Sequence, residues 1–216
     1  MISLIAWLAA FVVAITVHEA SHAWAADRLG DPTPRLMGRL SLNPAVHYDK
    51  VGTTLLLILV IMRSFGIPVI PFGWAKPVRF DPYNLKNPRR DAALISLAGP
   101  ASNLILATLL ALVLRFLQTP FSPYALTIFL IPMISLNVVL AIFNLLPIHP
   151  LDGGKILVGL LPEKDARHVD MFLSRYGIFL LFLAIFPFGG TSIITTLISP
   201  ALSLILGILI PGNTLI

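Results

Sequence analysis

The chain has 216 residues, of which 57% are hydrophobic and only 12% are charged. Ordinary soluble domains carry about a quarter charged residues, so this chain has roughly half the charge that a soluble fold needs. The composition excludes a water-soluble enzyme, a disordered chain and a collagen-like chain. It predicts a polytopic membrane protein.

The charged and sulfur-containing residues narrow the class further. Fifteen basic against ten acidic residues give a formal net charge of +5. The basic residues stand singly between apolar segments, which predicts that they face the cytoplasm and lipid head groups and that no nucleic acid is bound. The chain has no cysteine, so disulfides, thiol nucleophiles and thiolate metal sites are excluded, and a bound metal must use His, Asp or Glu.

The first apolar segment covers residues 1–26, with no Lys or Arg before Arg28. A secretory signal would begin with basic residues and have a short apolar core, whereas this segment is longer and its charges follow it. We therefore predict a retained transmembrane helix with its N-terminus outside and its C-terminus in the cytoplasm.

Residues 35–42 alternate between apolar and polar side chains. A period of two is typical of a strand, and a lone strand beside a membrane has an unpaired backbone edge. An extended substrate could pair with that edge, so we expect substrate binding here. The candidate side chains are Arg35, Leu36, Arg39 and Leu40.

Residues 51–62 are apolar, but as a helix they are too short for the roughly 30 Å hydrocarbon core. A turn-rich stretch follows at residues 66–82, and several basic residues come next. Those basic residues would lie outside if residues 51–62 crossed the membrane, against the positive-inside rule. We predict a re-entrant or half-depth element.

Later apolar segments predict further membrane helices. Residues 91–117 and 124–147 are long enough to span, and the link between them has no Lys or Arg, so we expect it outside. Residues 151–175 carry four basic residues and are expected in the cytoplasm. Residues 177–198 predict a fourth span, and residues 201–210 form a short apolar tail.

The predicted fold is therefore an all-α polytopic membrane protein, with four to six transmembrane helices and a short membrane-associated β-strand or hairpin. We expect one domain over residues 1–216. Its parts are the first span at 1–26, the strand and re-entrant region at 31–90, the central spans at 91–161 and the C-terminal helices at 162–216.

Residues 18–22 read His-Glu-Ala-Ser-His at the end of the first span. Histidines four positions apart share one face of a helix, so both Nε2 atoms can bind one zinc ion. Glu19 can then serve as the base for a metal-activated water. The alternative is a buried polar cluster that holds helices together.

A catalytic zinc ion takes three protein ligands and leaves one position for water. The strongest candidate for the third ligand is Asp152, which follows Pro147 and Pro150 and precedes two glycines. The prolines interrupt the helix, and the glycines allow another element to approach closely. The alternative is a helix N-cap, a position that Asp favours.

His-Glu-x-x-His on the first span, together with Leu-Asp-Gly after a later one, resembles the site-2 protease family of intramembrane zinc metalloproteases. Further matches lie at residues 43–44 (Asn-Pro), 72–78 and 99–103 (Gly-Pro-Ala-Ser-Asn). The resemblance covers roughly residues 14–157, the catalytic core. Because the chain has no room for the PDZ or CBS domain of some members, it is similar to the minimal subgroup.

The resemblance implies a zinc metalloendopeptidase that hydrolyses peptide bonds in or near transmembrane segments of membrane proteins. It implies one zinc ion per chain, held by His18, His22 and Asp152, with Glu19 as general base. The implied partners are a membrane-protein substrate with a transmembrane helix and the lipid bilayer, and a homo-oligomer is compatible with it. The implied location is the cell membrane, with the active site open to cytoplasmic water.

Several further residues carry open assignments. Asn103 matches an asparagine that is implied to help catalysis by binding substrate or stabilising the oxyanion; an interhelical hydrogen bond is the alternative. Asn144 is a weaker candidate for substrate binding. His149 stands where the family often has proline, and it could bind the metal, donate to the intermediate or lie behind the ligands. His47 and His168 lie in polar segments and are expected to be exposed.

Two other functions compete with the protease. A divalent-metal transporter can also carry His-Glu-x-x-His on a span, but it would need serial ligands along a path. A pseudoprotease would bind membrane helices without cutting them, but binding alone needs no base, and Glu19 is present.

Overall fold

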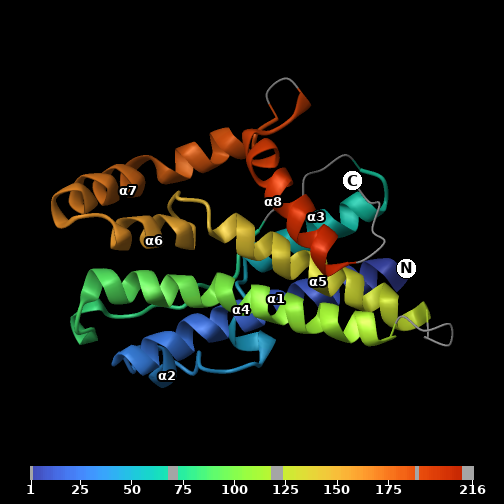
Figure 1. Cartoon of the computed structure of the whole chain (residues 1–216), viewed down its shortest axis with the longest axis horizontal. Coiled ribbons are helices and arrows are strands. Elements are labelled where there is room, and N and C mark those ends of the chain that lie inside the picture. Colours follow the sequence, from blue (N-terminus) through green and yellow to red (C-terminus); the bar gives the residue numbers. More distant parts are fainter. Residues whose placement is uncertain (1, 68–72, 118–123, 188–189, 211–216) are drawn as a thin grey trace.

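The computed structural model describes residues 2–67, 73–117, 124–187 and 190–210 (Figure 1). Within these ranges the regular structure is helical, which confirms the predicted all-α class. The longer helices are α1 (Ile2–Leu29), α3 (Gly52–Ser64), α4 (Pro88–Leu117), α5 (Tyr124–Asn144), α6 (Asp152–Leu160), α7 (Glu163–Ile185) and α8 (Ile193–Leu209), and the short ones are α2 (Thr33–Leu36) and the 3-10 turns Pro44–Val46 and Pro82–Asn84.

Four of the described helices, α1, α4, α5 and α7, are long and apolar enough to cross a membrane. The first three agree with the predicted spans. The predicted span at residues 177–198 is wrong, because α7 ends at Ile185 and α8 begins at Ile193. Phe186, which precedes Pro187, is extended with a ψ of 130° and caps α7, and Gly190 turns the chain with a φ of +106°.

The bundle core is built by α1, α4 and α5, which pack against one another, while α6 lies on α4, α8 on α5, and α7 on α6 and α8 (Figure 1). On α1, Ala6, Ala10 and Ala14 are buried at four-residue intervals. Small side chains on one helix face let neighbouring backbones approach closely. This close packing brings the end of α1 against the middle of α4.

The predicted strand at residues 35–42 is wrong. The segment starts in α2, turns at Gly38 with a φ of +69°, and forms no strand; nor does any other described part of the chain. The burial of its side chains does not follow the alternation. Arg39 is 3% exposed and donates to backbone carbonyls, while Leu36 is 79% exposed. The alternation marks a loop that turns its arginine inward.

The predicted half-depth element begins with α3, whose 13 residues span about 20 Å. The helix lies directly against the chain that follows it. A Cβ at Gly73 would come within 2.3 Å of the Gly52 oxygen, and the Thr53 hydroxyl donates to the Trp74 carbonyl over 3.1 Å. Residues 68–72 of this element lie outside the described residues. Its depth in the membrane stays a prediction.

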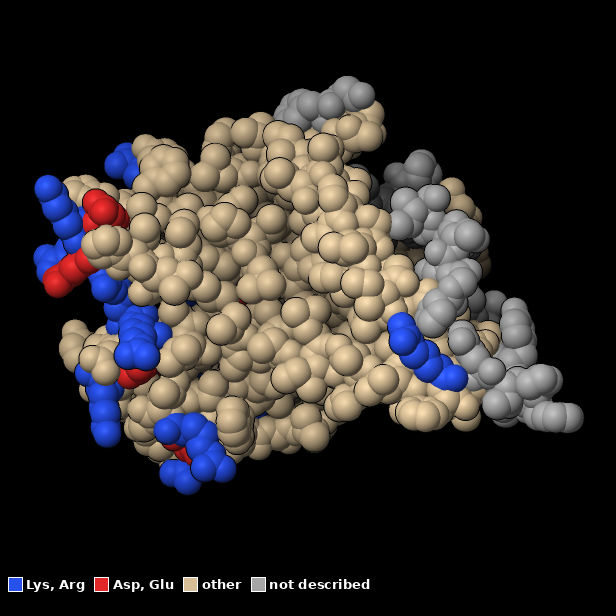
Figure 2. Space-filling view, in the orientation of Figure 1, with Lys and Arg blue, Asp and Glu red and all other residues tan. Residues whose placement is uncertain are grey.

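Charged side chains gather at one end of the molecule (Figure 2), where α4 begins and α6 leads into α7. The rest of the face shown there is almost uncharged. An uncharged body with charges collected at one end suits a bilayer, because charged side chains are costly in hydrocarbon. The arrangement agrees with the multi-pass membrane location.

Asp31 connects the end of α1 to the chain before α4. Its side chain is fully buried, and it accepts hydrogen bonds from the Thr33 amide and hydroxyl, the Asp81 amide and the Asn84 side chain at 2.6 to 3.1 Å. Burial raises the pKa of Asp31, but these hydrogen bonds outweigh that effect and hold the pKa below its usual range. Asp31 therefore fixes the path of the chain that crosses α1.

Asp31→Ala should lower the free energy of unfolding by about 1 to 3 kcal/mol, because the Asp81 amide and the Asn84 side chain lose their buried acceptor. The depressed pKa makes this stabilisation fully present above the unfolded-state value of about 3.9 and lost as the pH falls through the folded-state value. Unfolding in detergent at pH 7 measures the effect. The exposed Asp165→Ala is the matched control, and equal stability of the two variants would contradict the role of Asp31.

Candidate metal centre

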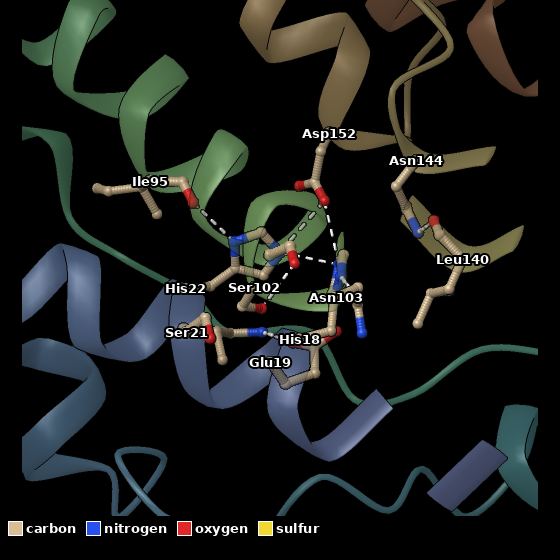
Figure 3. A network of polar contacts seen from close by, with 12 residues as sticks. His18, Glu19, Ser21, His22, Ile95, Ser102, Asn103, Leu140, Asn144 and Asp152 are labelled. Atoms are coloured by element: carbon tan, nitrogen blue, oxygen red, sulfur yellow. Dashed lines mark hydrogen bonds and ion pairs between the residues drawn. The ribbon is translucent and has the colours of Figure 1, made fainter. Parts of the chain in front are cut away.

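Three metal-binding side chains from distant parts of the sequence meet inside the bundle (Figure 3). His18 and His22 extend from α1, and Asp152 reaches them from the first turn of α6. The two Nε2 atoms are 3.0 Å apart, and they lie 3.1 and 3.2 Å from Asp152 Oδ2. Both histidines are buried.

The other nitrogen of each ring defines the tautomer. His22 Nδ1 lies 2.7 Å from the Ile95 carbonyl oxygen, and His18 Nδ1 lies 2.7 Å from the Asn103 side-chain oxygen. Each oxygen can only accept, so each Nδ1 carries the proton and donates it. In neutral imidazoles, both Nε2 atoms then face Asp152 as lone pairs.

Two imidazole lone pairs and a carboxylate oxygen within 3.2 Å of one another repel unless a cation lies between them. Asp152 Oδ2 is buried and has no hydrogen-bond donor, which is unfavourable for a charged oxygen unless it binds a metal. Tetrahedral zinc with bonds of about 2.0–2.2 Å sets its ligand atoms roughly 3.4 Å apart. The three residues fit zinc.

Gly99 allows α4 to touch the two histidines. A Cβ at this position would lie 2.5 Å from His22 Nε2 and 2.7 Å from His18 Cε1. Both distances are far below van der Waals contact, so any larger residue would displace the imidazoles. The close contact with the two imidazoles therefore explains why the Gly-Pro-Ala-Ser-Asn segment has a glycine at position 99.

Asn103 is fully buried on α4 and holds His18 from behind. While its oxygen accepts from His18, its nitrogen donates to the Ala14 carbonyl over 2.9 Å and to Asn137 over 2.7 Å. Both amide hydrogens are thus already used. The sequence analysis did not single out Asn137, which is fully buried. Its signal in the sequence is an asparagine within the apolar span 124–147.

Glu19 follows His18 on α1 and is held from outside the bundle. Its Oε2 accepts a hydrogen bond of 3.0 Å from the Val78 amide. Val78 belongs to residues 73–81, a segment without helix or strand that we call the strap. The carboxylate is half-buried beneath the strap, beside the two imidazoles.

The remaining predicted residues lie around this centre. Asn144 ends α5 and donates to the Leu140 carbonyl of its own helix (Figure 3). His149 lies 3.1 Å from Asp170 Oδ1 on α7 and is not one of the three clustered ligands. Arg35 is paired with Asp27 at 3.2 Å.

The two histidines outside the motif behave differently from each other. The expectation that His47 is exposed is wrong: the residue is 1% exposed, and its Nε2 lies 2.9 Å from the Ser41 carbonyl. His168 is exposed, as expected. Among the described residues, His18, His22 and Asp152 form the one group able to hold a metal. The serial ligands that a transporter needs are not found in that part of the chain.

Comparison with known proteins identifies the family. The family model described as peptidase family M50 matches residues 6–132 and 121–184. The zinc metalloprotease YwhC of Bacillus subtilis is 39% identical over 83% of this chain and 80% of its own length. Rip2 of Mycobacterium tuberculosis, also named a zinc metalloprotease, is 30% identical over 83% of this chain and 66% of its own length.

A more distant relative is the regulator of sigma-E protease RseP of Escherichia coli, which is 32% identical over half of this chain and a quarter of its own length. No solved structure gives a significant match. The family match spans most of the chain and includes all three clustered ligands. This chain belongs to peptidase family M50, the site-2 proteases, and is a zinc metalloendopeptidase.

Proposed function

We propose that this enzyme hydrolyses peptide bonds in or near the transmembrane segments of other membrane proteins, from an active site open to the cytoplasm. The observation that carries the proposal is the convergence of three potential ligand atoms, two of them on a helix long enough to span a bilayer. A peptidase whose metal ligands lie on a membrane-spanning helix has its active site close to the transmembrane segments of its substrates.

In this proposal, His18 and His22 hold zinc through Nε2, and Asp152 holds it through Oδ2. When bound, zinc supplies Lewis acidity that activates a water and polarises the scissile carbonyl. The hydrogen bonds from each Nδ1 to Ile95 and Asn103 keep the rings aimed at the ion. We therefore propose that Asn103 orients His18 and does not contact the oxyanion, because both hydrogens of the Asn103 amide are already donated.

Glu19 is the proposed general base. Its carboxylate takes a proton from the attacking water and passes it to the nitrogen of the departing amine, so that one water is added across the peptide bond. The Val78 hydrogen bond occupies Oε2 and fixes the carboxyl group, so the proton transfers fall to Oε1.

The position of the charges supports the proposed orientation. The ligands lie in the C-terminal half of α1 and at the start of α6. Charged side chains gather at the end of the molecule where α6 leads into α7 (Figures 1 and 2). By the positive-inside rule, we expect that end in the cytoplasm and the N-terminus outside. Water, which hydrolysis consumes, then reaches the centre from the cytoplasm.

Substrate contacts are also proposed here. The exposed side chains of Leu36 and Leu40 offer apolar contacts beside α2, and Asn144 offers an amide near Asp152 (Figure 3). Arg35 stays accessible although it is paired with Asp27. The burial of Arg39 excludes it from this surface.

Glu19→Gln should keep its zinc and lose cleavage by a factor of about 10² to 10⁴ or more, because a neutral amide cannot accept the proton. Zinc content and turnover of a panel of single-span peptides are measured together. The only other glutamate of the chain supplies the control, Glu163→Gln, which lies on the surface. A Glu19→Gln enzyme that binds zinc and still cleaves would disprove the assignment of the base.

Asp152→Asn should weaken zinc binding at least about tenfold, because it replaces a charged ligand with a neutral amide of the same shape. Competition with a chelator measures the affinity. Asp170→Asn is the control, since Asp170 contacts His149 and no clustered ligand. If the two variants retained zinc equally, Asp152 would not be a ligand.

Gly99→Ala should lower zinc occupancy and activity together, because the added methyl group would overlap both imidazoles. Gly207→Ala on α8 is the matched control, as a Cβ there meets no atom within 4 Å. Metal analysis after purification, with helicity followed by circular dichroism, distinguishes loss of zinc from loss of fold. Full occupancy in Gly99→Ala would contradict the described contact.

A further inference from the structure

The strap has no secondary structure, and side chains from other parts of the chain hold its backbone. Three of these side chains act on main-chain atoms: Thr53 donates to Trp74, Asp31 accepts from Asp81, and Glu19 accepts from Val78. A fourth, Arg39, donates to the carbonyls of residues 76 and 77. A catalytic carboxylate is thus one of the groups that hold the strap.

Arg39 is an unusual residue for its position. Its side chain is 3% exposed, and its guanidinium donates to the carbonyls of Val46, Lys76 (2.7 Å) and Pro77 (3.1 Å). None of the ion pairs found among the described residues involves Arg39. A buried guanidinium without a carboxylate is costly, so its burial needs an explanation beyond packing.

The nearest explanation is the charge of Glu19. Burial lowers the pKa of Arg39, and the negative charge of Glu19 opposes that shift. The two side chains act on one peptide group. The Pro77 oxygen accepts from Arg39 Nη2, and the Val78 N–H donates to Glu19 Oε2.

The geometry of the peptide unit makes this arrangement specific. In a planar trans peptide, the C=O and the N–H point in opposite directions. The Pro77–Val78 peptide therefore has its negative end on the guanidinium and its positive end on the carboxylate. Hydrogen bonds to ionised groups are the strong ones, and each polarises the other through the shared peptide.

We propose that Arg39 is a positioning residue that orients the Glu19 carboxylate through the Pro77–Val78 peptide. Arg39 touches neither water nor substrate in this role. It fixes the rotation of one peptide plane, and that plane fixes one oxygen of the base. The inference rests on the proposed function of Glu19 as general base, and it adds a part of the site that the zinc-binding motif does not contain.

The test removes either end of the peptide contact. Val78→Pro deletes the N–H that binds Glu19, and Val78→Ala keeps it. Arg39→Met keeps the apolar stem and deletes every donor. Each purified variant is compared with wild type for zinc content, kcat and KM on a single-span peptide that wild type cleaves.

Val78→Pro and Arg39→Met should each lower kcat by roughly tenfold to a hundredfold, which is the effect of losing one charge-assisted hydrogen bond in the transition state. Zinc content and KM should stay within about twofold of wild type. Val78→Ala should exceed Val78→Pro in kcat by about tenfold or more. The double variant should be no slower than the slower single variant, because both changes break the same contact.

Three results would overturn the proposal: equal kcat in Val78→Pro and Val78→Ala, multiplied losses in the double variant, or loss of zinc in step with activity. The last would show that the strap only maintains the fold. Val78→Pro leaves Arg39 in place, so the question is decided even if Arg39→Met does not fold. Glu19→Gln separates the two ideas: if it cleaves, the base is wrong, and if it alone is inactive, only the role of Arg39 is wrong.

Discussion

The repulsion among three electron-rich atoms is the constraint on which this structure depends. His18 and His22 on α1 lie far from Asp152 on α6 in the sequence, yet their ligand atoms converge to within 3.2 Å. The rest of the bundle supports that convergence. The alanine face of α1 brings it close to α4, Gly99 removes the obstruction at the crossing point, and the N–H groups of both rings are directed backward onto α4.

The sequence predicted which side chains converge at the centre better than it predicted the surroundings of the centre. Positions four apart on a helix have a fixed geometry, so the histidine pair could be read directly, and the requirement for a third ligand pointed to Asp152. The role of Ile95 could not be predicted, because a backbone carbonyl has no sequence signature. Asn137 stands out as a polar residue in an apolar span, but its hydrogen-bond partner is defined only by packing. Hydrogen-bonded pairs of residues that are far apart in the sequence can be identified only from the tertiary structure.

Arg39 shows why the loops were predicted less well. A period of two reports which residues alternate, but it does not say which set faces inward, and it does not distinguish a strand from an irregular loop. The deciding factor was a set of backbone carbonyls that could satisfy a buried guanidinium. The misplaced fourth span has a similar origin: hydropathy alone extended the apolar run across Pro187, where backbone geometry ends the helix.

The way in which the strap is held determines which substitutions disturb it. Lys76, Pro77 and Val78 contribute main-chain atoms to every contact described for them, and the side chains of Lys76 and Pro77 are exposed. The path of this segment therefore depends on side chains outside it, among them Asp31, Arg39 and Thr53. Replacing the exposed side chains of Lys76 and Pro77 therefore leaves these main-chain contacts in place, whereas replacing Asp31, Arg39 or Thr53 removes a contact that holds a segment distant from them in sequence.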